Sequence, residues 1–365
     1  MKKKVLLVSP IHNNGGIASW TRKYIKDFPQ VEYELLLIAS DPKRKAGNLS
    51  ILQRILSGVM ALHRVMREVR HILNKERVEI LHKTTSGSLG ALTDWRLGRY
   101  CKKRGVKNIL HCHYGCIPEV LDGSGLVRWL TLKSMQQFDQ IWVLDKRTYN
   151  YLRQRKDVKA EIILTPNCID VKPNMEIIPK SYTNIAFIGN LYETKGILEL
   201  IDAIDKVPTE IQLHIVGDGD ELVKQDILEH AGDLYGNRVK CYGRLPNNEA
   251  VEFMKKMDIL ALPTYYPFEA FPISILEAMS LGKLVISTRR AAIGDMLTTE
   301  KGQNCGLFVR EKNVDDIVTA INWAYHHKQE ADKLCQLAYQ KVYQNYRTEI
   351  IYKLYLDCYR KSISD

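Results

Sequence analysis

The stretch that decides the fold is residues 263–285, PTYYPFEAFPISILEAMSLGKLV. Its pattern predicts a loop, a short amphipathic helix, a tight turn at Gly282-Lys283 and a buried strand. Pro272 suits the first turn of that helix, because this position has no intrahelical partner for an N–H group. Glu269 then lies in the loop before the helix, and Glu277 lies more than one turn inside it.

The start of this predicted helix is suited to an anion. Backbone N–H groups near Phe271, Ile273 and Ser274 have no acceptor within the helix. They lie at its N-terminus, which is the positive end of the helix dipole. A carboxylate on either side of such a helix start suits a sugar joined to a nucleotide diphosphate.

Length and composition favour an ordinary globular protein. The chain of 365 residues is long enough for two cores, with 45% hydrophobic and 26% charged residues. It contains no run of about 18 apolar residues, so we expect no transmembrane helix. The start, MKKKVLLVSP, is too short in apolar residues for a signal peptide and predicts a first strand. We therefore expect a cytoplasmic location, with peripheral attachment to the inner face of the cell membrane as an extension.

The charge is unevenly placed. Residues 1–170 contain 30 Lys and Arg against 15 Asp and Glu, whereas residues 171–365 contain 23 against 27. The basic first part indicates an anionic partner: a phosphorylated acceptor, an anionic membrane surface or nucleic acid. No aromatic-basic motif of the usual RNA-binding kinds is present, so we expect no nucleic acid. Solvated lysines without a partner remain an alternative.

Metal binding is not favoured. The eight cysteines follow no repeated spacing, and Cys112 and Cys116, beside His111 and His113, lack a second pair at zinc-site distance. Reduced cysteines are the simpler interpretation.

Strand and helix patterns alternate along the whole chain. Such alternation predicts parallel sheets covered on both faces, in two α/β halves with a cleft between them. Strands are expected at residues 4–9, 34–39, 78–82, 108–113, 140–144, 161–164, 184–188, 212–216, 239–241, 259–262, 284–287 and 306–309. Helices are expected at residues 17–28, 49–73, 197–204, 248–256 and 315–326, and a helical stretch at 331–362. In the helix at 49–73 the residues Leu52, Leu56, Val59, Val65, Val69 and Leu73 share roughly one side.

Candidate ligand-binding residues follow the strands, at the end where parallel sheets bind ligands. In the first half these are Gly15-Gly16, which precede a helix, and His113. Adjacent glycines let a ligand approach the backbone closely, although a plain turn explains them equally well. His113 is either a ligand contact or a histidine that satisfies a local carbonyl.

In the second half the loop of residues 189–196 ends with Lys195 at a helix start, which suits a phosphate. The spacing of an ATPase phosphate loop is absent. Asp218 and Asp220 form either a metal site or, as we prefer, a turn with a helix cap.

Together these positions resemble glycosyltransferase family 4, the retaining glycosyl transferases of group 1. The resemblance covers nearly the whole chain, and the glutamate pair, followed by Ala278-Met279 and Gly282-Lys283, is its most specific part. It implies a GT-B fold, two Rossmann-like domains facing across a cleft. Residues 1–170 would bind the acceptor, residues 171–345 would bind the nucleotide sugar, and a helix over 346–365 would cross back to the first domain.

The resemblance also implies roles for single residues. Glu269, His113 and Lys195 would be the catalytic residues: Glu269 would hold hydroxyls of the donor sugar, with His113 beside the sugar and Lys195 at the diphosphate. Glu277 would hold the ribose. The remaining donor contacts would be Gly15, Gly16, Gly189, Asn190, Phe271, Pro272 and Ile273.

Two positions depart from the family pattern. Asn190 stands where Arg is usual, so one partner of the diphosphate is missing, with Arg244, Arg289 or Arg290 as substitutes. In the hinge sequence Pro166-Asn167-Cys168-Ile169-Asp170, Cys168 replaces a glycine, which predicts some backbone strain.

The sequence thus predicts a hexosyltransferase that uses a nucleotide-diphosphate sugar without a metal or other cofactor. The expected acceptor is a lipid-linked saccharide in surface polysaccharide biosynthesis. A nucleotide-sugar epimerase of the same fold, and an inactive family member serving as the partner of another protein, remain alternatives.

Overall fold

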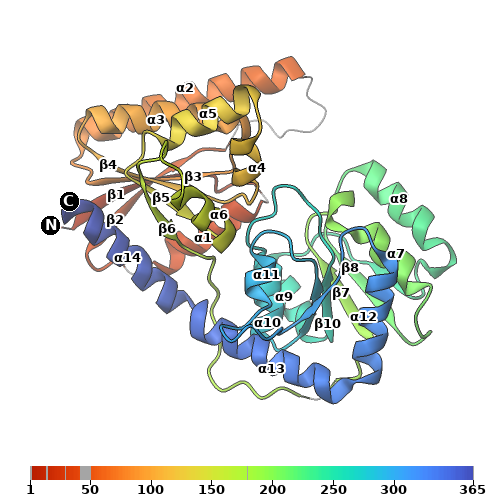
Figure 1. The fold of residues 1–365 in the computed structure, drawn as a ribbon. Helices are drawn as coiled ribbons and strands as arrows, with labels where there is room; N and C mark the ends of the chain where they lie inside the picture. Colours follow the sequence, from red (N-terminus) through yellow and green to blue (C-terminus); the bar gives the residue numbers. More distant parts are fainter. Residues whose placement is uncertain (1, 14, 29, 42–50, 179, 365) are drawn as a thin grey trace. The chain divides into compact units, whose positions relative to one another are not determined.

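The computed structural model describes residues 2–13, 15–28, 30–41, 51–178 and 180–364. The chain divides into two compact units (Figure 1): a first unit of Met1–Asn167 with Ile351–Asp365, and a second unit of Cys168–Ile350. Residues 168–170 therefore belong with the second unit, and the last helix contributes most of its length to the first.

The first unit is built on a parallel sheet of six strands in the order β2-β1-β3-β4-β5-β6. The strands at residues 80–85 and 140–143 are buried along their whole length, as expected where helices cover both faces. The strands are β1 (Lys3–Ser9), β2 (Tyr33–Ala39), β3 (Ile80–Thr85), β4 (Lys107–Cys112), β5 (Gln140–Val143) and β6 (Glu161–Leu164). The helices are α1 (Gly16–Asp27), α2 (Ile51–Lys75), α3 (Ala91–Lys103), α4 (Ile117–Asp122), α5 (Gly125–Met135) and α6 (Lys146–Arg153), with a 3-10 turn η1 (Ser88–Gly90).

The second unit is built on a second parallel sheet, in the order β12-β11-β10-β7-β8-β9. The strands are β7 (Asn184–Ile188), β8 (Gln212–Val216), β9 (Val239–Cys241), β10 (Ile259–Leu262), β11 (Leu284–Ser287) and β12 (Leu307–Phe308). The helices are α7 (Ile197–Ile204), α8 (Glu221–Ala231), α9 (Asn247–Lys255), α10 (Ile273–Ser280), α11 (Ile293–Met296), α12 (Val314–His326) and α13 (Lys328–Asn345), with 3-10 turns η2 (Glu193–Lys195) and η3 (Gly232–Leu234).

The strand predictions are confirmed in number and order, and most differ from the observed bounds by two residues at most. The largest shift is in β3, which was expected at 78–82 and runs from Ile80 to Thr85. The two threonines at its end extend the strand because their hydroxyls are satisfied internally: Thr84 bonds with Ser9, and Thr85 donates to Asp94.

The predicted helical stretch of residues 331–362 is wrong at its centre, where it breaks into α13 and α14 (Thr348–Ser364). At the break Ile169 takes over the backbone bonding. Its amide donates to the carbonyl of Tyr346 over 3.0 Å, and its carbonyl accepts from the amide of Thr348 over 3.1 Å. These bonds replace the intrahelical ones, so the helix cannot continue.

The part of α14 in the first unit packs through its tyrosines. Tyr355 stacks on Trp142 with ring centroids 4.9 Å apart. The hydroxyl of Tyr359 lies 2.5 Å from that of Tyr24 and 2.6 Å from Nδ1 of His82, all inside the core. The tyrosine-rich end of the chain is therefore a structural part of the first unit.

The expected backbone strain at Cys168 is not observed. Cys168 is buried and is not among the residues with a positive φ angle. The chain therefore passes this position in a conformation open to any L-residue, and the glycine of the family pattern is not required here.

Candidate active site

The second sheet has one topological switch point, between β7 and β10. From β7 the chain proceeds outward to β8 and β9, then returns to β10 and proceeds the other way to β11 and β12. The loops after β7 and β10 therefore diverge, and a crevice forms at the carboxyl ends of these strands, where open α/β sheets bind ligands. The loop after β7 is that of residues 189–196, and the loop after β10 carries Glu269.

Lys195 and Glu269 meet at this switch point. The Nζ of Lys195 lies 2.5 Å from Oε2 of Glu269, and the side chains are 14% and 8% exposed. The same oxygen accepts a hydrogen bond from Thr264 over 3.1 Å. The Nζ of Lys195 also lies 5.0 Å from the ring centroid of Tyr266. The two side chains thus form a nearly buried ion pair held from two loops.

A glycine makes the close approach of these loops possible. Gly196 has a φ of +76°, and a Cβ there would lie 2.3 Å from the carbonyl oxygen of Pro263. The adjacent backbone bond from Tyr265 to the carbonyl of Thr194 (2.8 Å) joins the two loops. Any other residue at 196 would separate the loops and move Lys195 away from Glu269.

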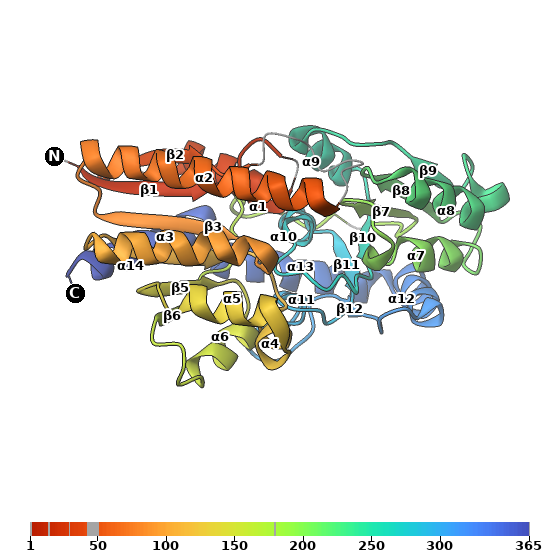
Figure 2. The same cartoon turned by 90° about the horizontal axis from the view of Figure 1, so that it is seen from above.

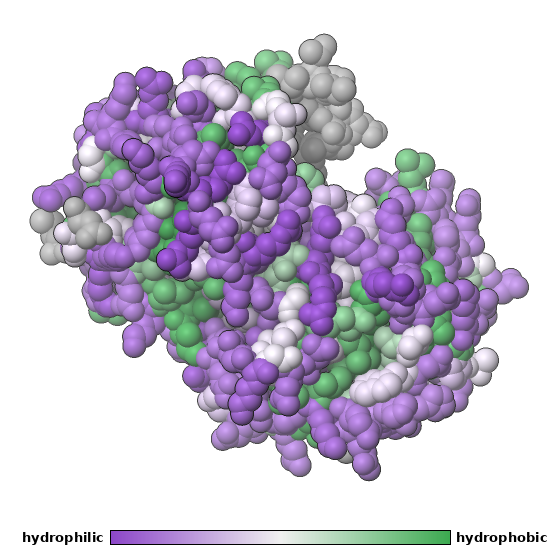
Figure 3. All heavy atoms as spheres, viewed as in Figure 1, coloured by the Kyte–Doolittle hydropathy of each residue, from purple (hydrophilic) through white to green (hydrophobic). Residues whose placement is uncertain are grey.

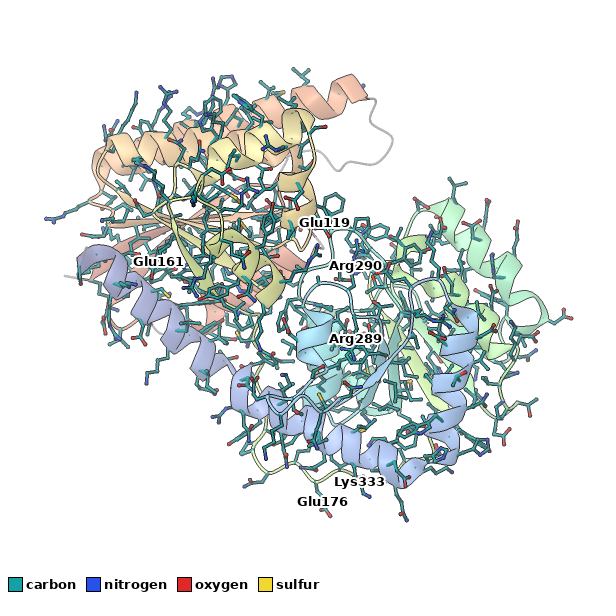
Figure 4. The ribbon with its side chains drawn as sticks, in the orientation of Figure 1. Glu119, Glu161, Glu176, Arg289, Arg290 and Lys333 are labelled. Atoms are coloured by element: carbon teal, nitrogen blue, oxygen red, sulfur yellow. The ribbon has the colours of Figure 1, made fainter. Side chains whose placement is uncertain are left out.

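Asn190 lies beside Arg244, one of the three arginines considered as substitutes. The Nη2 of Arg244, which follows β9, lies 3.4 Å from Oδ1 of Asn190. Arg289 and Arg290 instead follow β11 (Figure 4), where Arg289 covers the ring of Phe308 and Arg290 pairs with Glu311. Of the three arginines, Arg244 is therefore the one that lies beside Asn190.

Helix α10 begins one residue later than predicted, with Pro272 as its N-cap rather than in its first turn. No side chain caps this helix start, so the first N–H groups, including that of Ile273, are available to an anion. Glu277 is the fifth residue of α10 and is buried. Its Oε1 accepts a hydrogen bond of 2.9 Å from Asn247, at the start of α9. Burial raises the pKa of Glu277, and the bond from Asn247 opposes that shift.

The glycine loop of the first unit lies after β1. Gly15 is the N-cap of α1, and its amide donates to the side chain of Asn13 over 3.0 Å. Neither Gly15 nor Gly16 has a positive φ, and a Cβ at Gly16 would meet no atom within 4 Å. The backbone does not require a glycine at 16, so what the residue provides there is open space.

His113 follows β4 in the first unit, and its amide donates to the carbonyl of Thr85 over 2.9 Å. Its ring centroid lies 4.1 Å from that of His111 and 5.0 Å from that of Trp20. Nε2 of His113 is buried and has no hydrogen-bond partner among the described residues. Burial, helped by the nearby charge of Lys83, lowers the pKa of His113 to about 3, so the ring is neutral at neutral pH.

The first sheet has its switch point between β1 and β3, where a hollow of about 220 Å³ opens. Among its lining residues, Nζ of Lys83 lies 3.4 Å from Oδ1 of Asp94, and both side chains are buried. Its polar lining comprises Asn13, Ser40, Asp41, Lys83, Thr84, Thr85, Ser86, Thr93 and Asp94. Hydroxyl and carboxylate groups at this density suit a ligand with several hydroxyls.

The structure thus joins Lys195 with Glu269, and Glu277 with Asn247, in the second unit, while Gly15, Gly16 and His113 belong to the first. Sequence reasoning missed Thr264, Asn247 and the pair Lys83 and Asp94. The polar run Lys83-Thr84-Thr85-Ser86 at the end of an apolar strand was a signal for the last of these, since parallel strands bind ligands at that end.

Asp218 and Asp220 act in a turn, as preferred. Asp220 caps α8 by accepting from the amide of Val223 over 3.0 Å, and Asp218 pairs with Lys224 at 3.0 Å. Across the described residues, no three His, Cys, Asp or Glu side chains lie together as a group that could hold a metal ion. Nor does any described helix combine the length and apolar character of a membrane span.

Comparison with known proteins identifies this architecture. Over 316 residues the chain is 24% identical to "Uncharacterized glycosyltransferase MJ1178" of Methanocaldococcus jannaschii, covering 84% of each. It is 26% identical to one of the phosphatidylinositol N-acetylglucosaminyltransferase subunits of Arabidopsis thaliana, over 81% of this chain and 66% of that protein. The structure of Anabaena HepE in complex with UDP-glucose matches with a TM-score of 0.74 and 15% identity, over 98% of this chain and 99% of that one.

The fold is therefore that of the GT-B glycosyltransferases, as predicted. Residues 170–341 match the family model of glycosyl transferases group 1. The match lies within the second unit, and the resemblance to glycosyltransferases is confirmed at this level.

Proposed function

We propose that this protein is a retaining glycosyltransferase of family 4. It transfers a hexosyl group from a nucleotide-diphosphate sugar to a lipid-linked saccharide in surface polysaccharide biosynthesis. The observation that carries the proposal is the Lys195–Glu269 ion pair at the switch point of the second sheet, beside the uncapped start of α10. Sugar transfer develops positive charge at the anomeric carbon and negative charge on the departing phosphate. The carboxylate of Glu269 is complementary to the first, and Lys195 with the N–H groups of α10 is complementary to the second.

The donor half of the reaction uses the second unit. Departure of the nucleotide diphosphate places negative charge on its phosphate oxygen, and Lys195 with the N–H groups of α10 stabilises that charge. When the donor binds, Lys195 exchanges its ion pair with Glu269 for one with the phosphate. The carboxylate of Glu269 can then accept hydrogen bonds from sugar hydroxyls. Glu277, held by Asn247, accepts from the ribose hydroxyls. Because these groups supply the charge stabilisation, the proposed reaction needs no metal ion.

The bond to the acceptor forms on the face from which the diphosphate leaves. The C1–O bond to the phosphate breaks, the acceptor oxygen bonds to C1, and the acceptor proton passes to the departing phosphate oxygen. We assign no covalent intermediate to Glu269, because its carboxylate accepts a hydrogen bond from Thr264 and, in this proposal, hydrogen bonds from the sugar hydroxyls. The neutral His113, with an unpartnered Nε2, offers a hydrogen bond to a sugar hydroxyl.

The acceptor half uses the first unit. The hydroxyl-rich hollow between β1 and β3 suits a saccharide, and the basic charge of this part of the chain suits an acceptor carried on a lipid phosphate. The name of the Arabidopsis relative, which includes phosphatidylinositol, is consistent with a lipid-borne acceptor. We place the protein peripherally at the cytoplasmic face of the membrane.

A thermal-shift screen of nucleotide sugars tests the donor assignment. A ligand that binds only the folded protein at about 100 times its Kd stabilises it by about 2.7 kcal/mol, so the true donor will raise the melting temperature. Glu269→Ala will lose most transfer to a lipid-linked acceptor. Near-normal transfer by that variant, or release of isomerised free sugar without any acceptor, would contradict the proposal.

A further inference from the structure

Three helices of the first unit, α2, α3 and α5, carry a large excess of positive over negative charge. Their sequences contain eleven Lys and Arg against two carboxylates, Glu68 and Asp94, while the net charge of the whole chain is +11. Asp94 is buried against Lys83, so it does not reach the surface. Figures 1 and 2 show the three helices on one face of the sheet, which we call the basic face.

A hollow of about 870 Å³ lies on this face, between α2 and α3. Its charged lining consists of cations alone: Arg64, Arg67, Arg70, Arg96, Arg99 and Lys103. Arg64 is tied to the backbone carbonyls of Ala39 and Asp41. By contrast, Arg67, Arg96, Arg99 and Lys103 make no hydrogen bond or ion pair within the described parts of the chain. Four cations at one hollow without carboxylates repel one another, so the hollow is suited to a phosphate.

The same face also exposes large apolar side chains. Leu56 and Met60 on α2 are 61% and 64% exposed, and Leu126 and Trp129 on α5 are 62% and 44% exposed. Trp129 contacts Trp95, which lines the hollow together with Met60. In Figure 3 hydrophobic atoms are visible at the beginning of α2. An apolar group rimmed by cations is typical of a surface that contacts lipid.

The exposure of Leu56 shows that the prediction of one shared apolar side for the helix at residues 49–73 is wrong in part. The side of α2 that packs on the sheet consists of Leu62, Val65, Met66 and Val69, all buried. Leu56 was expected on that side but is exposed, and so is Val59, at 40%. Residues 49–50 lie outside the described chain. The helix therefore packs on its own sheet and also presents a second apolar group to the surface.

We propose that the basic face docks on a bilayer that contains anionic phospholipid. Phosphate headgroups enter the hollow between α2 and α3, where guanidinium groups bind them, and Met60 and Trp129 enter the interfacial layer. Exposed leucine and methionine favour this partner over nucleic acid, which offers no apolar layer for them. The inference names the surface and the lipid chemistry for the membrane location proposed above, and it does not depend on the transfer reaction.

Vesicle flotation of the full chain tests the proposal. We expect binding to vesicles of phosphatidylcholine mixed with phosphatidylglycerol, little binding to phosphatidylcholine alone, and loss of binding at high salt. Each cation near such a surface changes partitioning roughly fivefold. Arg67→Glu/Arg99→Glu, which removes two positive charges and adds two negative ones, changes the charge of this face by four units and will weaken binding by several hundredfold, on the order of 5 to the fourth power. Trp129→Ser will weaken it severalfold and reduce the blue shift of tryptophan fluorescence on vesicle addition.

Two control variants separate the possible explanations. Lys256→Glu/Lys301→Glu makes the same change in net charge with exposed lysines of the second unit and will float like the wild type. Glu269→Gln will lose transfer but keep vesicle binding, so failure of the proposed reaction cannot be mistaken for failure of docking. Equal binding to neutral and anionic vesicles would overturn the proposal. Wild-type flotation by the double arginine variant, or its displacement from vesicles by a short RNA, would do so as well.

Discussion

The two switch points of this protein share a topology and differ in chemistry. Between β7 and β10 of the second unit lie Lys195 and Glu269, a pair held in the loops beyond the strands. Between β1 and β3 of the first unit lie Lys83, inside β3 itself, and Asp94, inside α3. An ion pair in loops can exchange its partner for a ligand at small cost, whereas a pair inside two packed elements is part of the core.

The groups around the two ion pairs show the same difference between a structural pair and one that can exchange its partner. Lys83 also donates to the carbonyl of Thr84, and Asp94 accepts from Thr85 over 2.5 Å, so the first pair is satisfied from within. The second pair lies beside a helix start that no side chain caps. Equal strand order thus places a charged pair at the same point of each sheet, while the element that carries each residue decides whether the pair is fixed in the core or can exchange its partner for a ligand.

The largest effect is expected on the stability of the first unit. Asp94→Leu will leave Lys83 charged and unpaired in the core, and will reduce the free energy of unfolding by about 3–5 kcal/mol. Guanidinium unfolding followed by tryptophan fluorescence measures it, since four of the five tryptophans lie in the first unit. Lys83→Met/Asp94→Leu will recover most of the loss. A single variant as stable as the wild type would remove the distinction between the two pairs.

The second pair should show the reverse behaviour, with a large effect on catalysis and a small one on stability. Glu269→Gln and Lys195→Met will each reduce kcat by about a hundredfold, as for the loss of one group that stabilises transition-state charge. The double variant will lose less than the product of the two, because the residues act as a unit. Steady-state rates measure the effects on kcat, and melting temperatures measure the effects on stability.

The exposed pair Lys255 and Glu252 on α9 provides the matched control for this experiment. Glu252→Gln will leave kcat unchanged. If Glu269→Gln lowered the melting temperature as much as Asp94→Leu does, its ion pair would be structural after all.

Acid should destabilise the first unit before the second. Burial lowers the pKa of His82 to about 3, and His111 is shifted in the same direction. Their unfolded pKa is near 6.5, so folding keeps them neutral while the unfolded chain gains protons, and stability is lost as pH falls from about 6.5 towards 3. For His82 alone the loss is about 2 kcal/mol at pH 5.

The sign is opposite for Glu277 in the second unit. Its pKa is raised in the folded state, so its ionisation disfavours folding at neutral pH and this penalty is relieved as pH falls. The variant His82→Gln tests the histidine contribution. Because Gln does not titrate, the free energy of unfolding will fall more steeply for the wild type than for His82→Gln as the pH is lowered from about 6.5 towards 3. Identical pH profiles would show that His82 does not contribute.

The smallest effect is expected at Glu277, the proposed ribose contact. Glu277→Gln removes a charge-assisted hydrogen bond made equally in the ground state and the transition state, so KM for the donor will rise about tenfold while kcat changes little. Asn247→Ala will shift KM in the same direction by less. A fall in kcat at constant KM would instead assign Glu277 to the chemical step.

Much of this arrangement follows from local sequence. The strands Asn184–Ile188, Gln212–Val216 and Ile259–Leu262 were predicted at their observed bounds, because short apolar runs between turn residues have one stable form in a covered parallel sheet. Once these strands were predicted, Lys195 and Glu269 could be placed in the loops that follow them without further information. Both residues were therefore predictable from the sequence, and the start of α10 was predictable to within one residue.

Tertiary structure alone decided which groups meet. Asn247 and Glu277 are 30 positions apart, and Asp94 is 11 positions from Lys83; nothing in a local pattern encodes such a contact. The same holds for the break between α13 and α14, which depends on backbone bonds from Ile169. It holds also for Leu56, which has the period of a buried residue and is exposed. Local propensity selects strand or helix, but burial and partners depend on the packing of elements distant in the chain.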